Sequence, residues 1–130
     1  MSQENVDLCR KLFDTAQRLD WDAWDQYIDP DIFVRLDPSW PEQRIYGREA
    51  LRRFWLDARA TLGSDAWIED IVDLGDRVLV RLGAHTHGQR SGLESEFRWT
   101  EISTIREGRF VFAEVFLDHH QALKAVRLEE

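Results

Sequence analysis

The apolar positions of this chain repeat with a helical period in its first half and alternate like strands in its second half. Residues 3–19 carry apolar side chains every three or four positions, and a shorter stretch at 21–28 repeats that spacing. Both patterns predict amphipathic helices, the second of them capped by Asp20 or Asp22. The segment 29–31, Asp-Pro-Asp, should end the second helix.

A short strand is predicted at 32–36, and a third helix at 48–62. The segment between them, 37–47, contains two of the three prolines and is predicted to be a loop. This loop carries Trp40 and Tyr46, more aromatic surface than a plain connector needs. These rings either cover the mouth of a pocket or pack on the body of the protein.

After Gly63 the period changes from helical to strand-like. Helices lead and strands follow, which predicts one α+β domain over residues 1–130, with the helices packed against one sheet. The predicted strands lie at 66–74, at 77–87 and, as a hairpin, within 94–118, and the last helix begins at Asp118. Asp118 with Gln121 three residues later is a helix-capping arrangement, so we assign Asp118 a structural role.

The predicted hairpin turns at Glu107-Gly108, because glycine tolerates the positive φ of a two-residue loop. That turn places Ile105 opposite Phe110 and, further from it, Glu101 opposite Glu114. The two carboxylates would then share an aromatic face of the sheet, where charges are costly unless paired, solvated or used in chemistry. The aromatic and aliphatic members of this face are Phe97, Trp99, Ile105, Phe110, Phe112 and Phe116.

The amino-acid composition argues against some classes of binding partner. The net charge of −8 and the pI near 5.0 argue against nucleic acid and anionic membranes. No apolar run reaches transmembrane length, and Cys9, the single cysteine, suits a reducing cytoplasm. Only Lys11 and Lys124 among the 17 basic residues are lysine, a bias typical of GC-rich bacterial genomes.

Four short motifs lie at the ends of the predicted helices and strands or in the turns between them: GREA at 47–50, DLGDRV at 73–78, IREGR at 105–109, and FLD with QAL within 116–123. Together with the order of the elements, they resemble the SnoaL-like branch of the nuclear-transport-factor-two-like superfamily. The resemblance implies a cone: a curved, mostly antiparallel sheet around helices that encloses an apolar pocket, commonly as a homodimer. The other face of the predicted hairpin is largely apolar and needs cover, so a homodimer through the sheet is predicted. The resemblance also implies a range of functions, from polyketide cyclases and ketosteroid isomerases to silent binding domains.

Laid against the ketosteroid isomerase pattern, Asp37 falls near that family's catalytic base and Glu101 near its proton-donating acid. The position of its tyrosine falls near Leu12, so that donor is missing and steroid isomerisation by this mechanism is not expected. Asp37 before Pro38 is equally typical of a turn residue.

The opposed pair of Glu101 and Glu114 is the sharper candidate. Two carboxylates in an apolar site cannot both ionise easily, so one pKa should rise and allow acid/base catalysis. The alternative is an ion pair, with Arg81 or Arg98 neutralising one of the two glutamates.

Histidines supply a weaker candidate. His85 and His87 share one face of a strand, and His85 would be a suitable base if it pointed inward. No third ligand has metal-site spacing, so no metal and no cofactor are predicted. The residues predicted to line a substrate pocket are Trp40, Tyr46, Trp55, Trp99 and Phe116.

These observations predict a small-molecule pocket protein. In one interpretation it is a cofactor-free isomerase, cyclase or hydrolase that acts on an apolar, oxygenated substrate. In the other it is a non-catalytic ligand-binding or dimerisation domain.

Overall fold

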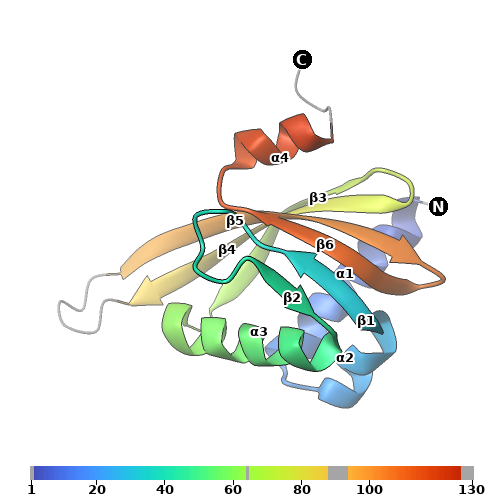
Figure 1. Ribbon diagram of the computed structural model, residues 1–130, viewed down its shortest axis with the longest axis horizontal. Coiled ribbons are helices and arrows are strands. Elements are labelled where there is room, and N and C mark those ends of the chain that lie inside the picture. Colours follow the sequence, from blue (N-terminus) through green and yellow to red (C-terminus); the bar gives the residue numbers. More distant parts are fainter. Residues whose placement is uncertain (1, 64, 88–93, 127–130) are drawn as a thin grey trace.

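The computed structural model describes residues 2–63, 65–87 and 94–126 (Figure 1). The first half contains α1 (Ser2–Gln17), α2 (Trp21–Tyr27), β1 (Ile28–Arg35), β2 (Arg44–Tyr46) and α3 (Arg48–Leu62). The second half contains β3 (Ala66–Asp73), β4 (Arg77–His87), β5 (Glu94–Arg106), β6 (Arg109–Phe116) and α4 (His119–Ala125). Within these residues, no helix is long and apolar enough to cross a membrane.

The described strands form one curved sheet in the order β2-β1-β6-β5-β4-β3. Neighbouring strands are antiparallel except β1 and β6, which run parallel. Helices α1, α2 and α3 lie against one face, here called the inner face, while α4 lies on the opposite, outer face (Figure 1). This is the α+β cone predicted from the sequence, so the fold prediction is confirmed.

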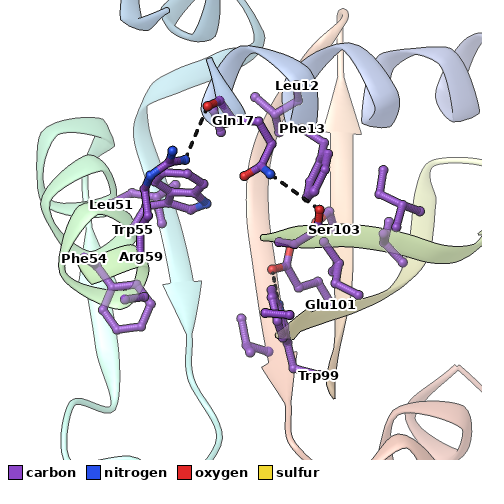
Figure 2. A pocket seen from close by; sticks show the side chains of 18 of the residues that line it. Leu12, Phe13, Gln17, Leu51, Phe54, Trp55, Arg59, Trp99, Glu101 and Ser103 are labelled. Atoms are coloured by element: carbon purple, nitrogen blue, oxygen red, sulfur yellow. Dashed lines mark hydrogen bonds between the residues drawn. The ribbon is translucent and has the colours of Figure 1, made fainter. Parts of the chain in front are cut away.

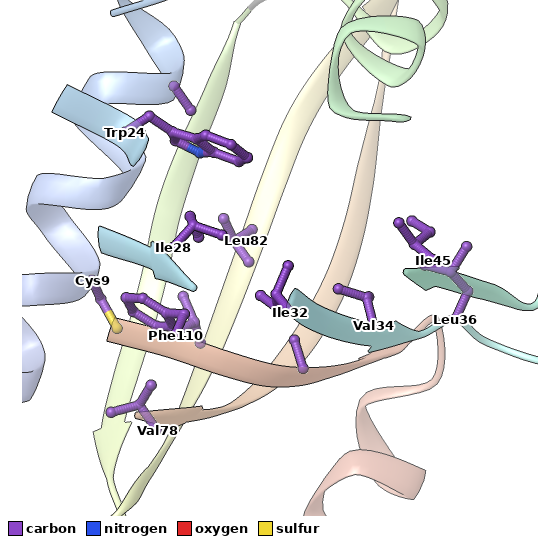
Figure 3. Packing of buried hydrophobic residues seen from close by; sticks show 13 residues of the cluster. Cys9, Trp24, Ile28, Ile32, Val34, Leu36, Ile45, Val78, Leu82 and Phe110 are labelled. Atoms are coloured by element: carbon purple, nitrogen blue, oxygen red, sulfur yellow. The ribbon is translucent and has the colours of Figure 1, made fainter. Parts of the chain in front are cut away.

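The main core fills the space between the inner face and the first helices (Figure 3). Trp24 of α2 meets Ile28 and Ile32 of β1, and all three are almost completely buried. Fully burying one such side chain stabilises the fold by roughly 1.5–3 kcal/mol. A second, smaller cluster lies under α4 on the outer face, where Ala122 packs on Leu79 and Ile102.

Several local predictions are confirmed. Asp20 caps α2 by accepting a hydrogen bond of 3.2 Å from the backbone N of Ala23. Gly63 ends α3 with a φ of 101°. Glu107 and Gly108 form the hairpin turn with φ values of 51° and 76°. Asp118 caps α4 through the backbone N of His120.

Two boundaries differ from the prediction. The segment 29–31 belongs to β1 instead of closing α2, at a point where the pairing of β1 with β6 is irregular. Such an irregularity tolerates proline, which cannot donate to a regular ladder. The predicted loop at 37–47 ends early, because residues 44–46 pair with β1 as the edge strand β2. The connection between the strands predicted at 77–87 and within 94–118 lies outside the described residues.

The predicted register of the hairpin is correct only next to the turn. Ile105 does face Phe110, but the pairing shifts between Thr104 and Ile105, so that Thr104 pairs with Phe112. Val111 is therefore an extra residue of a β-bulge. A shift of one residue turns every later side chain of β6 to the other face. As a result, Glu101 pairs with Val115, Ile102 with Glu114 and Thr100 with Phe116.

Candidate functional site

A cavity of about 200 Å³ lies between the inner face of the sheet and helices α1 and α3 (Figure 2). Its wall is mainly apolar and strongly aromatic, with rings contributed by helices α1, α2 and α3, by the loop before β2 and by β5 and β6. Such a wall excludes water and suits an apolar ligand. The aromatic residues are Phe13, Trp24, Trp40, Phe54, Trp55, Phe97, Trp99 and Phe110.

Glu101 projects from β5 into this cavity (Figure 2). The indole Nε1 of Trp99 donates a hydrogen bond of 2.8 Å to Oε2 of Glu101. Among the described residues, none donates a hydrogen bond to the other oxygen, Oε1, and the fully enclosed side-chain atom without a partner is Arg52 Nε. Oε1 therefore opens onto the free space of the cavity, which is why the deeply placed side chain is only half-buried.

The surroundings of Glu101 favour its neutral form. Burial raises the pKa of its carboxyl, and the hydrogen bond from Trp99, which favours the charged form, offsets only part of this effect. No arginine of the described residues contributes to the pKa of this carboxyl. With Trp99 bound to one oxygen, the proton of the neutral acid belongs on Oε1, where it faces the cavity. The arrangement can therefore offer a proton or a strong hydrogen bond to a ligand oxygen.

Cys9 of α1 lines the same cavity. Burial raises the pKa of its thiol to about 12, and the charge of Glu101, when present, acts in the same direction. A thiol that holds its proton this tightly is a poor nucleophile. Cys9 is therefore a buried, inert thiol.

Arg59 of α3 is the cation of the cavity wall. Its guanidinium lies over the ring of Trp55, 5.4 Å from the ring centroid, and Nη1 donates a hydrogen bond of 3.3 Å to the backbone oxygen of Gln17 (Figure 2). Sequence reasoning missed Arg59. The available signal was its spacing, because a residue four positions after Trp55 lies on the same face of a helix.

Of the predicted pocket residues, Trp40, Trp55 and Trp99 line the cavity. The ring of Trp40 packs against Phe54 and Phe97, at centroid distances of 5.8 and 6.4 Å. The loop before β2 therefore does bring an aromatic ring to the cavity, as one of the two alternatives from the sequence required.

Tyr46 and Phe116 are not among the described lining residues. Tyr46 is 67% exposed and packs on Phe33 of the outer face. Phe116 packs under α4, because the β-bulge turned it to the outer face.

Glu114 does not meet Glu101, since the bulge also turned Glu114 outward. It forms an ion pair of 3.1 Å with Arg35. The expected alternative partners of Glu101 are engaged elsewhere: Arg81 and Arg98 both bind Glu69, at 2.9 and 2.8 Å. The predicted pairing of the two carboxylates is therefore wrong. In the alternative, an arginine does bind Glu114, but it is Arg35 and neither Arg81 nor Arg98.

Asp37 lies outside the cavity wall and holds a turn. Its Oδ2 accepts a hydrogen bond of 2.9 Å from the backbone N of Leu117, and its Oδ1 accepts two from Ser39. The bond from Leu117, followed by those from Ser39, lowers the pKa of the Asp37 carboxyl. This is the turn role that the sequence allowed for Asp37.

His85 packs against Trp67, with ring centroids 4.8 Å apart, and is not among the described lining residues of the cavity. The side chain of His87 lies outside the described part of the structure. Among the side chains that are described, no group of three His, Cys, Asp or Glu residues is placed to hold a metal ion.

Comparison with known proteins identifies a matching protein family. A family model for the SnoaL-like domain matches residues 9–113. A search of curated protein sequences gave no match.

Solved structures give the same fold. A proposed polyketide cyclase from Sinorhizobium meliloti is 27% identical, with a TM-score of 0.63 over 88% of this chain and 98% of that protein. IdmH from Streptomyces antibioticus, also a proposed polyketide cyclase, is 21% identical, with a TM-score of 0.74 over 95% and 98%. A proposed SnoaL-like polyketide cyclase from Jannaschia sp. CCS1 is 18% identical, with a TM-score of 0.76 over 100% and 96%.

Proposed function

Because this chain belongs to the SnoaL-like domain family, we propose that it transforms a small apolar, oxygenated molecule by cofactor-free acid/base chemistry at Glu101. The substrate would lie in the aromatic cavity, with a carbonyl oxygen against Oε1 of Glu101. The observation that carries this proposal is a carboxyl of raised pKa whose second oxygen opens onto an apolar cavity.

The proposed step is enolisation, an acid/base reaction that needs no oxidant or reductant. Glu101 gives its proton to the carbonyl oxygen, and the resulting carboxylate removes a proton from the adjacent carbon. The electron pair of the broken C–H bond forms the C=C bond of the enol, and Glu101 is neutral again. An enol of this kind leads either to isomerisation or to carbon–carbon ring closure.

Glu101 serves both halves of this step because it is the sole carboxylate among the described residues of the cavity wall. Trp99 positions the carboxyl for this task. Its N–H occupies Oε2 and leaves Oε1 for the substrate.

The second candidate is a non-catalytic binding domain. The observation that favours it is the same lone carboxyl, because the partner carboxylate predicted from the sequence lies on the opposite face of the sheet. The two candidates differ in whether bound ligand exchanges protons with the protein.

We would measure deuterium incorporation at C2 of 1-indanone, a small apolar ketone, by proton NMR in D₂O. The wild-type protein should accelerate exchange over buffer, and Glu101→Gln should lose at least about a hundredfold of that acceleration, the scale of a general acid–base contribution. Glu114→Gln is the matched control, since it removes a carboxylate from the other face and should leave exchange unchanged.

Binding is followed separately through the fluorescence of the cavity tryptophans. Ketone that binds to the wild type without faster exchange would establish the binding-domain alternative. A ketone that neither binds nor exchanges would contradict both candidates.

We also propose that the protein is a cytoplasmic homodimer through the outer face of the sheet. Phe33, Tyr46 and Phe112 stack there, with centroid distances of 4.9 and 5.6 Å, beside the ion pair of Arg35 and Glu114. An apolar patch flanked by both charges is self-complementary about a two-fold axis.

A further inference from the structure

Building on the proposed function, we infer that the ligand of the cavity carries a carboxylate, bound by Arg59, at the end opposite the oxygen that meets Glu101. The ligand class is therefore a small cyclic or aromatic acid that also bears a ketone or phenol oxygen. Arg59 would set specificity by holding one end of the ligand while the other end meets the acid.

The first argument is the unused hydrogen-bonding capacity of Arg59. A guanidinium has five N–H donors, and Arg59 uses one of them, through Nη1, on the backbone oxygen of Gln17. No carboxylate in the described part of the chain forms an ion pair with it. Two other arginines of the same helix are neutralised, because Arg48 and Arg52 both bind Asp25, at 3.3 and 2.6 Å.

The second argument is the charge of the cavity. Glu101 and Arg59 are the two residues of the described wall that can carry a full charge near neutral pH. Arg59 forms no ion pair with Glu101 in the described part of the chain, and burial is the main cause that raises the pKa of the Glu101 carboxyl. When the Glu101 carboxyl is protonated, the form that its raised pKa favours, the described wall carries the positive charge of Arg59 alone, and an anionic ligand group balances it.

The third argument is the arrangement of the two groups. Arg59 on α3 and Glu101 on β5 face each other across the cavity (Figure 2). Trp55 holds the guanidinium through a cation–π contact, which fixes a planar fork suited to a carboxylate. A ligand that reaches both groups must have an apolar body between two polar ends.

The size of the cavity limits that body. Its volume of about 200 Å³ exceeds the roughly 150 Å³ of an engineered apolar cavity that binds benzene. It is below the roughly 300 Å³ of the smallest sites for drug-sized ligands. One ring or two fused rings are therefore expected between the carboxylate and the oxygen.

The test compares indane-2-carboxylate with indane-2-carboxamide, which has nearly the same shape and no charge, by isothermal titration calorimetry. The wild type should bind the carboxylate about tenfold more tightly, the scale of a charge-assisted hydrogen bond that is partly open to water. Arg59→Gln should abolish this preference, and Arg59→Lys should keep part of it, because a lysine retains the charge without the fork.

Arg53→Gln is the matched control, since Arg53 is an exposed residue of the same helix and its loss should leave the preference unchanged. Glu101→Gln should also keep the preference while losing the exchange of 1-indanone. If the carboxamide and 1-indanone bind the wild type but the carboxylate has no advantage, the inference about Arg59 is wrong and the proposed function stands. A preference that survives in Arg59→Gln also overturns the inference, whereas a wild type that binds none of the three compounds contradicts the proposed function itself.

Discussion

Glu101 is a buried carboxyl, and its burial lowers the stability of the folded protein when the group would otherwise ionise. A carboxyl that stays neutral because it is buried would be more stable in water once it ionises. The hydrogen bond from Trp99 stabilises the charged form and offsets part of this cost. Among the described residues, no arginine forms an ion pair with the carboxyl to offset the remainder. An ion pair would have stabilised the charged form and removed the acid from the cavity.

This gives a prediction on the pH dependence of stability. An unfolded glutamate has a pKa of about 4.3. Below that pH, Glu101 is protonated in the folded and the unfolded state, so its ionisation does not change the free energy of unfolding. As the pH rises towards the higher folded pKa, the unfolded state releases its proton first, so the free energy of unfolding falls by up to about 1.4 kcal/mol per pH unit. Urea unfolding between pH 4.5 and 8 should show this fall in the wild type and not in Glu101→Gln. Parallel curves for the two proteins would contradict the raised pKa.

Among the elements, the loop between β1 and β2 depends on one carboxylate. Asp37 binds the backbone N of Leu117, just after β6, and thereby holds the segment that carries Trp40 to the cavity. The lowered pKa of Asp37 means that this stabilisation is present above about pH 3.8 and is lost as the pH falls through the folded pKa.

We expect Asp37→Ala to destabilise the protein by about 1–3 kcal/mol, because the amide of Leu117 loses its charged acceptor. Hydrogen exchange at Leu117 should become faster. Ser39→Ala is the control, as it removes one hydrogen bond to Asp37 and keeps the bond from Leu117. Unchanged exchange at Leu117 in Asp37→Ala would show that the loop is held by other contacts.

Position 83 of strand β4 requires glycine, because a larger residue there would collide with a side chain of the neighbouring strand β3. A Cβ added at Gly83 would lie 2.4 Å from the ring of Trp67, which also carries the contacts with His85 and Arg98. Gly83→Ala should therefore displace this ring and cost about 1–3 kcal/mol in urea unfolding. The same substitution in a Trp67→Ala background should cost much less. Equal costs in both backgrounds would place the strain elsewhere.

Prediction from the sequence succeeded where a residue pattern is compatible with one secondary structure only. The helical period gave the bounds of α3, and the turn residues gave the bend between β5 and β6. It failed along β6 because Phe-Val-Phe-Ala-Glu-Val-Phe at 110–116 is apolar on both faces, so a bulge at Val111 leaves either register plausible. Glu101 was found from the alternation of β5. Arg59 was missed because its spacing from Trp55 shows only that the two share a face of α3, while the contact of Arg59 with α1 depends on the tertiary structure.

At the scale of the whole molecule, the outer face is divided between two environments. Helix α4 covers the part formed by Leu79 and Ile102, while the stacked rings of Phe33, Tyr46 and Phe112 lie beyond that cluster. The proposed second copy would cover this aromatic patch.

Sedimentation should therefore give twice the 15.4 kDa mass of one chain for the wild type. Tyr46→Glu should give the single-chain mass, because a charge in the centre of an apolar interface is costly. Leu56→Glu is the control, since Leu56 is an exposed apolar residue of α3, at 38%, away from the sheet. A wild type that sediments as one chain would contradict the dimer.

The parallel pairing of β1 with β6 also has a consequence for synthesis on the ribosome. Ile28 of β1 has its partner in Phe110 of β6, so about 80 residues must follow it before the pair can form. At about 5–20 residues per second, that delay is roughly 4–16 s. During this time α1, α2 and β1 can make local contacts, but the surface that will form one wall of the cavity has no opposite wall. The nascent chain therefore carries exposed tryptophans and isoleucines until its last strand emerges, which makes it a substrate for chaperones that bind apolar segments.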